Sequence, residues 1–201
     1  MTPKFVLIHA KKNHGKSTMA NLVEAELSNV GIQCRQLVLA DAIRDMLMRT
    51  FDLPFEVFED QDIKNKPHPA LFGATPRTVL QLFGTDFAQK AFGKDIWCKL
   101  LYAEALKTPN YYIIIPDIRF EHEVEFFKRY MHTMIFLERE GATDTTETHS
   151  SEAGLMHLYD ELNPKMTRVD LPREATIEGT RHWVKNFLID FMFEERVGEY
   201  D

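Results

Sequence analysis

The first twenty residues constrain the fold most, because they hold a strand, a loop and a helix in the order that a phosphate-binding loop requires. Residues 4–8 (KFVLI) form a short apolar run, typical of a strand that is buried on both faces. The loop ends in GKST at residues 15–18, and apolar residues then recur at helical spacing as far as Gly31. The chain is therefore predicted to begin with a strand–loop–helix unit.

The residues of this loop suit the binding of phosphate groups. Backbone N–H groups and the positive end of the following helix attract anions. We expect Lys16 to reach the outer phosphates, Ser17 to ligate Mg²⁺, and Gly15 to let the backbone approach the anion. The motif G-x-x-x-x-G-K-[ST] has a glycine where this chain has Ala10, so the match is partial. We predict a nucleotide-phosphate site, with a plain basic loop as the alternative.

Strand and helix patterns alternate along the rest of the chain. Strand-like runs occupy 33–39, 111–115, 133–137 and 166–171, and helical patterns occupy 40–50, 75–93, 95–107, 121–131 and 183–192. Alternation of this kind predicts parallel strands joined by right-handed crossovers. We predict an α/β fold of the P-loop NTPase type, a three-layer sandwich. Its central, mostly parallel sheet has about five strands, with helices on both faces.

We expect residues 1–201 to form one domain with two additions to this core. Residues 51–110 are predicted to be a helical, substrate-binding insertion, because long excursions at the ligand edge of an α/β sheet are often clamps. Residues 139–155 are polar and rich in Thr and Asp, which is typical of a lid-like loop.

Composition excludes several classes of protein. The net charge of -7 argues against stable binding to a nucleic acid, although a nucleotide needs only a local cationic pocket. Cys34 and Cys98 lie far apart, without the spacing of metal ligands, which favours reduced thiols. No apolar stretch approaches the roughly 20 residues that cross a bilayer. We expect a cytoplasmic protein that has no membrane partner.

Polar residues at predicted strand ends are the next candidates. Asp117 and Arg119 follow the strand at 111–115, where a carboxylate can order the water around Mg²⁺ and an arginine can bind a phosphate. A structural salt bridge is the alternative. Asp41 follows the strand at 33–39 and is either a helix N-cap or a substrate contact.

The helix that begins at Thr75 and Pro76 carries a polar stripe. Arg77, Gln81 and Thr85 are spaced by four residues, which places them along one side. Such a stripe suits recognition of a phosphate and a base, and a solvated face is the alternative.

Four blocks of sequence together resemble the deoxynucleoside monophosphate kinases of tailed bacteriophages. These are the GKST loop, RTVLQLFGTDFAQKAFGKDIWCKLL, YYIIIPDIRFEHEVEFF and THSSEAGL, which span residues 4 to about 155 discontinuously. The resemblance implies transfer of the γ-phosphoryl group of ATP, with Mg²⁺, to a deoxynucleoside monophosphate (dNMP) as a step in supplying phage DNA precursors. It implies ATP and dNMP as partners.

The resemblance also implies roles for individual residues. Together with the residue-based candidates it gives three sets: ATP-binding Lys12, Gly15, Lys16, Ser17, Thr18 and Arg139; dNMP-binding Asp41, Arg77, Gln81, Gly84, Trp97, Asp117, Arg119 and Glu123; and catalytic Lys16, Asp117 and Arg119. Ser17 and Asp117 are the metal candidates. His149 and Glu152 recur in the resemblance without a derived role.

Two rival functions and one question of assembly stay open. A P-loop kinase acting on a modified base in DNA, such as 5-hydroxymethyluracil, would need a basic groove, which the net charge of -7 disfavours. A catalytically silent nucleotide-binding regulatory protein is disfavoured by the presence of Lys16, Asp117 and Arg119. The apolar closing helix could cover the core or the partner of a homodimer.

Overall fold

The computed structural model describes residues 2–11, 14–60, 62–108, 111–141, 155–158 and 166–198. The chain divides into two compact units. The sheet unit comprises Met1–Leu37 and Ala105–Asp201, and the helical unit comprises Val38–Glu104. The predicted insertion at 51–110 lies mostly within the helical unit.

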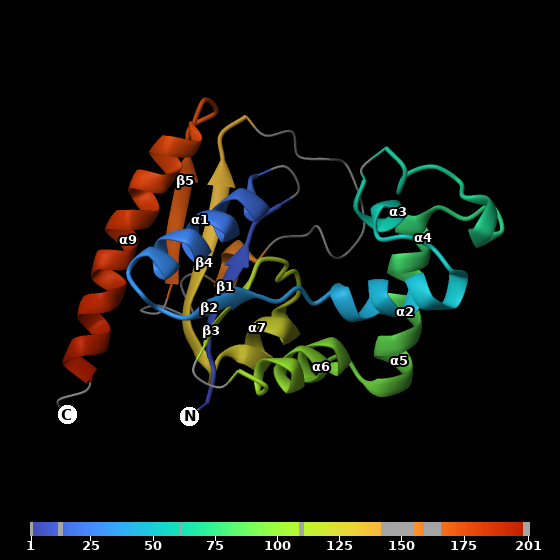
Figure 1. The fold of residues 1–201 in the computed structure, drawn as a ribbon, viewed down its shortest axis with the longest axis horizontal. Coiled ribbons are helices and arrows are strands. Elements are labelled where there is room, and N and C mark those ends of the chain that lie inside the picture. The colour runs from blue at the N-terminus through green and yellow to red at the C-terminus, as the bar shows by residue number, and fades with distance from the viewer. Residues whose placement is uncertain are drawn as a thin grey trace. The chain divides into compact units, whose positions relative to one another are not determined.

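Five parallel strands form the centre of the sheet unit (Figure 1). They are β1 (Lys4–His9), β2 (Cys34–Gln36), β3 (Tyr112–Ile115), β4 (Met131–Arg139) and β5 (Met166–Leu171), in the spatial order β2-β3-β1-β4-β5. Every neighbouring pair is parallel. The predicted five-stranded parallel sheet is confirmed, and its central strand is the one that leads into the GKST loop.

Helices cover both faces of this sheet, as predicted. On one face, α1 (Lys16–Asn29) and α9 (Ile177–Gly198) share a buried cluster with Val6 and Ile8 of β1. On the other face, the ring of Phe127 in α7 (Glu121–Phe127) lies 4.9 Å from the ring of Phe5. Alternate residues of β1 therefore face opposite layers, as the pleat of a strand requires.

The closing helix α9 covers the core of its own chain. Its Val184 and Leu188 are buried in the same cluster as α1, and Trp183 and Phe187 pack against that cluster with partial exposure. Figure 1 shows α9 running beside β5. The side chains of residues 189–198 lie outside the described part of the structure, so the homodimer stays a prediction.

Among the predicted elements whose lengths differ from the structure, two are shorter by four residues. The strand expected at 33–39 is limited to Cys34–Gln36. The helix expected at 121–131 ends at Phe127, and Met131 instead begins β4. Met131 pairs with Phe5, so strand pairing in the sheet overrides the helical pattern that continues through this apolar residue.

The helical unit consists of short helices (Figure 1). These are α2 (Asp41–Phe51), α3 (Glu56–Glu59), a 3₁₀ turn at Pro69–Leu71, α4 (Pro76–Gln81), a π-helical segment at Leu82–Phe87, α5 (Ala88–Phe92) and α6 (Ile96–Ala105). The predicted cap of α4 is confirmed, because the Thr75 hydroxyl accepts the backbone N–H of Thr78 at 3.1 Å. The single helix expected at 75–93 is divided by the π segment.

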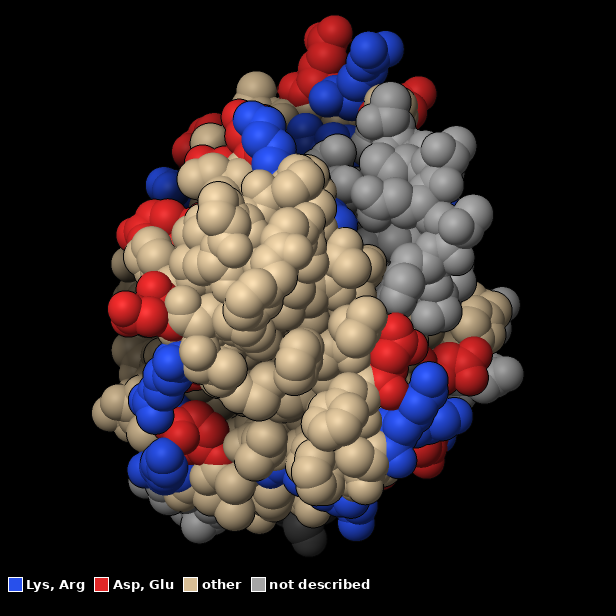
Figure 2. Space-filling view, turned by 90° about the vertical axis from the view of Figure 1, so that its right-hand side faces the viewer, with Lys and Arg blue, Asp and Glu red and all other residues tan. Residues whose placement is uncertain are grey.

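The surface of the helical unit is rich in apolar side chains. Charged side chains are sparse over the middle of the face shown in Figure 2. Exposed large apolar residues in this unit include Phe55, Phe72, Leu82, Phe87 and Phe92. Among the described residues, no helix combines the length and the apolar character needed to span a membrane.

Phe127→Ala is expected to destabilise the sheet unit strongly, because Phe127 is fully buried against Phe5. Removing a buried aromatic ring costs about 3–5 kcal/mol of unfolding free energy. Phe92→Ala is the matched control, since Phe92 is 63% exposed and its loss is expected to change that free energy by less than about 0.5 kcal/mol. Urea unfolding of both variants measures the difference, and equal effects would contradict the layer assignment.

Candidate functional site

Gly15 has the backbone conformation that only glycine adopts easily. It caps α1 with φ 95° and ψ 24°, in the left-handed region. A Cβ atom here would lie 3.5 Å from Nη2 of Arg139, which shows that this guanidinium lies beside the loop. The backbone N–H of Arg139 donates to Nδ1 of His14 at 3.0 Å, so the end of β4 is attached to the loop. The structure thus brings together Gly15 and Arg139, two of the predicted ATP-binding residues.

The side chain of Lys16 lies over the same loop. Its ammonium group donates to the backbone carbonyls of Ala10 at 2.6 Å and Lys11 at 3.2 Å. Ser17 and Thr18 follow in the first turn of α1, with exposed side chains. The backbone N–H groups of this first turn have no partners within the helix and are suited to bind an anion. Lys12 lies outside the described residues.

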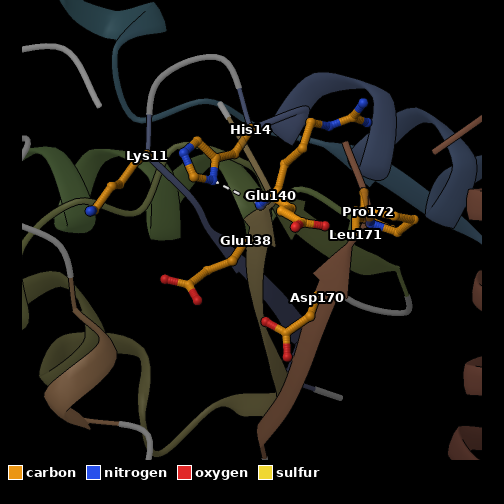
Figure 3. A pocket seen from close by; sticks show the side chains of 8 residues that line it. Lys11, His14, Glu138, Glu140, Asp170, Leu171 and Pro172 are labelled. Carbon is orange, nitrogen blue, oxygen red and sulfur yellow. Dashed lines mark hydrogen bonds between the residues drawn. The ribbon is translucent and has the colours of Figure 1, made fainter. Parts of the chain in front are cut away.

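A cavity of about 550 Å³ adjoins the loop at the carboxyl ends of β4 and β5 (Figure 3). It is lined by Lys11, His14, Glu138, Arg139, Glu140, Asp170, Leu171 and Pro172. This volume is within the range of small-molecule sites. The Arg168 guanidinium binds the carboxylates of Glu138 at 2.8 Å and Asp170 at 2.9 Å, which fixes two polar groups of the wall.

Sequence reasoning named only Arg139 among these lining residues. The others carry one signal that could have identified them: they follow or end predicted strands at the edge where ligands bind in parallel sheets. Neither the loop motif nor the helical spacing marks them. The cavity therefore depends on strand register, which places the ends of β4 and β5 side by side.

The loop after β3 carries Asp117 and Arg119 and is fixed by Glu123. One carboxylate oxygen of Glu123 accepts the backbone N–H groups of Arg119 at 2.7 Å and Phe120 at 3.0 Å. This is the reach-back contact typical of the first turn of a helix. Burial raises the pKa of Glu123 to about 7, and the negative charge of Asp117 contributes to the same shift. The structure therefore brings the predicted residues Asp117, Arg119 and Glu123 together on one short segment.

In the helical unit, two predicted dNMP-binding residues contact each other. The indole N–H of Trp97 donates to the carbonyl of Gly84 at 2.7 Å, and both residues are buried. A Cβ atom on Gly84 would lie 2.8 Å from Cδ1 of Ile43 in α2, so a larger residue here would require the Ile43 side chain to move. The hydrogen bond fixes the indole of Trp97, and the close approach of Ile43 favours a glycine at position 84.

The other predicted residues of the helical unit, Asp41, Arg77 and Gln81, are partly exposed. Nε of Arg77 donates to the amide oxygen of Asn65 at 2.7 Å. Gln81 is the last residue of α4, directly before the π segment. Asp41 is not an N-cap, which corrects one of its two interpretations: the cap position is Ala40, and the Asp41 carboxylate pairs with Arg44 at 2.5 Å.

The lid and the metal site remain predictions. Of the lid-like loop at 139–155, residues 142–154 lie outside the described part of the structure, and with them His149 and Glu152. The described residues contain no cluster of three or more His, Cys, Asp or Glu side chains that could hold a metal ion. Ser17 and Asp117 supply hard oxygen atoms, which suit Mg²⁺ because this ion keeps several waters and needs few protein ligands.

Glu123→Gln is expected to change how stability depends on pH. The folded protein keeps a proton on Glu123 up to about pH 7, whereas the unfolded chain loses it near the ordinary pKa of 4.5. As the pH rises through this range, the unfolding free energy of the wild type should therefore fall by on the order of 3 kcal/mol relative to that of Glu123→Gln. Urea unfolding of both proteins at pH 5 and pH 8 measures the change, and a constant difference would contradict the raised pKa.

Comparison with known proteins gives one family and several relatives. The family model "Deoxynucleotide monophosphate kinase" matches residues 72–162. A protein of Acanthamoeba polyphaga mimivirus, described as a candidate deoxynucleotide monophosphate kinase, is 29% identical over 159 residues, which cover 73% of this chain and 79% of that protein. The deoxynucleotide monophosphate kinase of Enterobacteria phage T4 is 33% identical over 82 residues, which cover 39% of this chain and 34% of the phage enzyme.

The solved structures that match this chain have lower sequence identity than the viral relatives. The APS kinase of Mycobacterium tuberculosis has a TM-score of 0.47 and 16% identity, and the match covers 94% of this chain and 99% of that one. A protein of Chloroflexus aurantiacus described as a candidate kinase has a TM-score of 0.45 and 12% identity, and the match covers 92% of this chain and 98% of that one. The family model and the two viral relatives confirm the resemblance to deoxynucleotide monophosphate kinases that the sequence predicts.

Proposed function

We propose that this protein transfers the γ-phosphoryl group of ATP to a deoxynucleoside monophosphate, giving ADP and a deoxynucleoside diphosphate. The proposal rests on the structure of the loop between β1 and α1. Its glycine adopts the left-handed conformation, and its lysine lies over the loop at the start of a helix. The match of residues 72–162 to the deoxynucleotide monophosphate kinase model supports a deoxynucleoside monophosphate as the acceptor.

The donor nucleotide fits the cavity beside this loop. With its phosphates on the backbone N–H groups at the start of α1, its nucleoside would occupy the cavity lined by Arg139, Leu171 and Pro172. Arg139 is near both the phosphate loop and the cavity: its guanidinium lies beside Gly15, its backbone N–H donates to His14, and it lines the cavity wall. We assign it to the donor side, where a guanidinium can stack on a base or bind a phosphate.

The transfer itself needs alignment and positive charge more than covalent chemistry. An oxygen of the acceptor phosphate attacks the γ-phosphorus atom of ATP, the bond to the bridging oxygen breaks, and ADP leaves. Lys16 can exchange its two carbonyl partners for phosphate oxygens, because hydrogen bonds between charged groups are stronger than those to neutral carbonyls. Arg119 supplies a second positive charge. Bound Mg²⁺, held through Ser17 and water ordered by Asp117, would neutralise further phosphate charge.

The residues that the resemblance gives to the acceptor are considered in each unit by itself. Asp117, Arg119 and Glu123 belong to the sheet unit, and Glu123 acts there by holding the backbone of Arg119. Asp41, Arg77, Gln81, Gly84 and Trp97 belong to the helical unit. Within that unit, the buried bond from Trp97 to Gly84 gives these two residues a role in shape, while Arg77 offers a charge for a phosphate.

Lys16→Ala is expected to lower the rate of transfer strongly, because it removes a charge that stabilises the transition state. Removing one such group typically lowers kcat by roughly 10²–10³-fold. The measurement is ADP production from Mg-ATP with each of the four common deoxynucleoside monophosphates and with a duplex that contains 5-hydroxymethyluracil, alongside a measurement of ATP binding. Lys128→Ala is the matched control, since Lys128 is an exposed lysine of the same unit, paired only with Glu125 among the contacts resolved for it.

Three outcomes of this assay would contradict the proposal in different ways. Transfer to a duplex that contains 5-hydroxymethyluracil, without transfer to any monophosphate, would indicate a kinase acting on DNA. ATP binding without transfer to either acceptor would indicate a regulatory protein. Equal activity of Lys16→Ala and wild type would exclude the loop from the chemistry.

Arg139→Ala is expected to weaken the donor side alone. A lost charge-assisted hydrogen bond should raise the KM for ATP about tenfold, while the KM for the monophosphate stays within about twofold. Arg129→Ala is the control, because Arg129 is an exposed arginine that stacks on Tyr130. Initial rates with each substrate varied in turn measure both constants. A change confined to the monophosphate would place Arg139 on the acceptor side.

A further inference from the structure

The last residue of the central strand is a buried histidine with two hydrogen bonds. His9 is 5% exposed. Its Nδ1 lies 2.9 Å from the carbonyl oxygen of Ile118, and the backbone N–H of Leu155 donates to its Nε2 at 3.1 Å. A carbonyl can only accept and a backbone N–H can only donate. The two contacts therefore fix one neutral tautomer, in which Nδ1 carries the proton.

The surroundings of His9 keep it neutral. Burial lowers its pKa to about 4, and the positive charges of Lys16, Lys11 and Arg119 lower it further, against the opposing effect of the Ile118 carbonyl. The ring also packs edge-on against Phe136 at 5.8 Å. At neutral pH the imidazole is thus a fixed donor on one side and a fixed acceptor on the other.

These contacts join segments that are far apart in sequence. Ile118 lies between Asp117 and Arg119, the two candidate catalytic residues of the loop after β3. The next residue after His9 is Ala10, whose carbonyl accepts the ammonium group of Lys16. Leu155 begins a short described segment, and His157 of this segment binds the Glu121 carboxylate at the start of α7. One imidazole therefore connects the phosphate loop to the loop that carries Asp117 and Arg119.

We propose that His9 is a positioning residue for phosphoryl transfer, which holds Asp117 and Arg119 in register with Lys16 through the carbonyl of Ile118. This inference rests on the proposed kinase function. The Leu155 bond has a supporting role, because it occupies Nε2 and so keeps the proton on Nδ1, where it binds Ile118. The motif of the phosphate loop does not include this position, and a polar residue at the end of a buried strand is its only mark in the sequence.

Two substitutions separate the two bonds. The amide of asparagine reaches the place of Nδ1, so His9→Asn can still donate to Ile118 but loses the acceptor for Leu155. The amide of glutamine reaches the place of Nε2, so His9→Gln can still accept from Leu155 but loses the donor to Ile118. Urea unfolding of each variant gives its stability, which allows a loss of activity to be compared with a loss of folding.

The experiment measures steady-state kinetics and amide hydrogen exchange by NMR on both variants. In His9→Gln we expect kcat to fall about tenfold, with the KM for ATP within about threefold of wild type, because the catalytic loop is displaced while the phosphate loop remains. The amides of Arg119 and Phe120 should exchange at least about fivefold faster. In His9→Asn we expect kcat within about threefold, and faster exchange only at Leu155.

Other results would overturn the inference. A His9→Gln variant with wild-type kcat, or equal losses of kcat in both variants that follow their stabilities, would reduce His9 to a packing residue. A wild-type protein without transfer activity would instead overturn the proposed function. The exchange rates would then test the positioning contact alone, and unchanged rates at Arg119 and Phe120 in His9→Gln would exclude it.

Discussion

The structure depends on the parallel register of β1 between β3 and β4. Leu7 lies opposite Ile115, and His9 lies opposite Phe136, so the three strands end at one edge of the sheet. Phe5 to Ile8 are fully buried, so the strand carries no polar side chain between Lys4 and His9. This edge therefore holds the phosphate loop, the Asp117–Arg119 loop and the cavity at β4 and β5. All three follow the carboxyl ends of buried parallel strands, where ligands bind in such sheets.

Burial sets the charge of each group at this edge. His9 is held neutral and the pKa of Glu123 is raised, so neither side chain brings a full charge into the interior at neutral pH. Lys16 rests on backbone carbonyls, and Arg119 has its backbone held by Glu123. The contacts described for Lys16 are thus with neutral carbonyls, and the carboxyl group that holds the Arg119 backbone has a raised pKa.

The parts of the fold that the sequence predicts correctly are those written in local patterns. Five strands, the turn at Gly15 and the cap at Thr75 each follow from residue types within a few positions. The end of α7 was misjudged because Met131 suits a helix and a strand equally, and pairing with Phe5 decides between them. His9 and the cavity wall were missed because their partners lie over a hundred residues away in sequence or on another strand, and no local spacing encodes such contacts.

The π segment at Leu82–Phe87 has a consequence for how this chain compares with others. A π turn holds one residue more than an α turn, so the segment is equivalent to a single residue inserted into an α-helix. Each inserted residue rotates the rest of the helix by about 100° relative to the turns before it. Positions in α5 of this chain therefore correspond to relatives with a continuous helix only if a one-residue gap is placed near Gly84. An alignment without that gap would pair side chains that point in different directions.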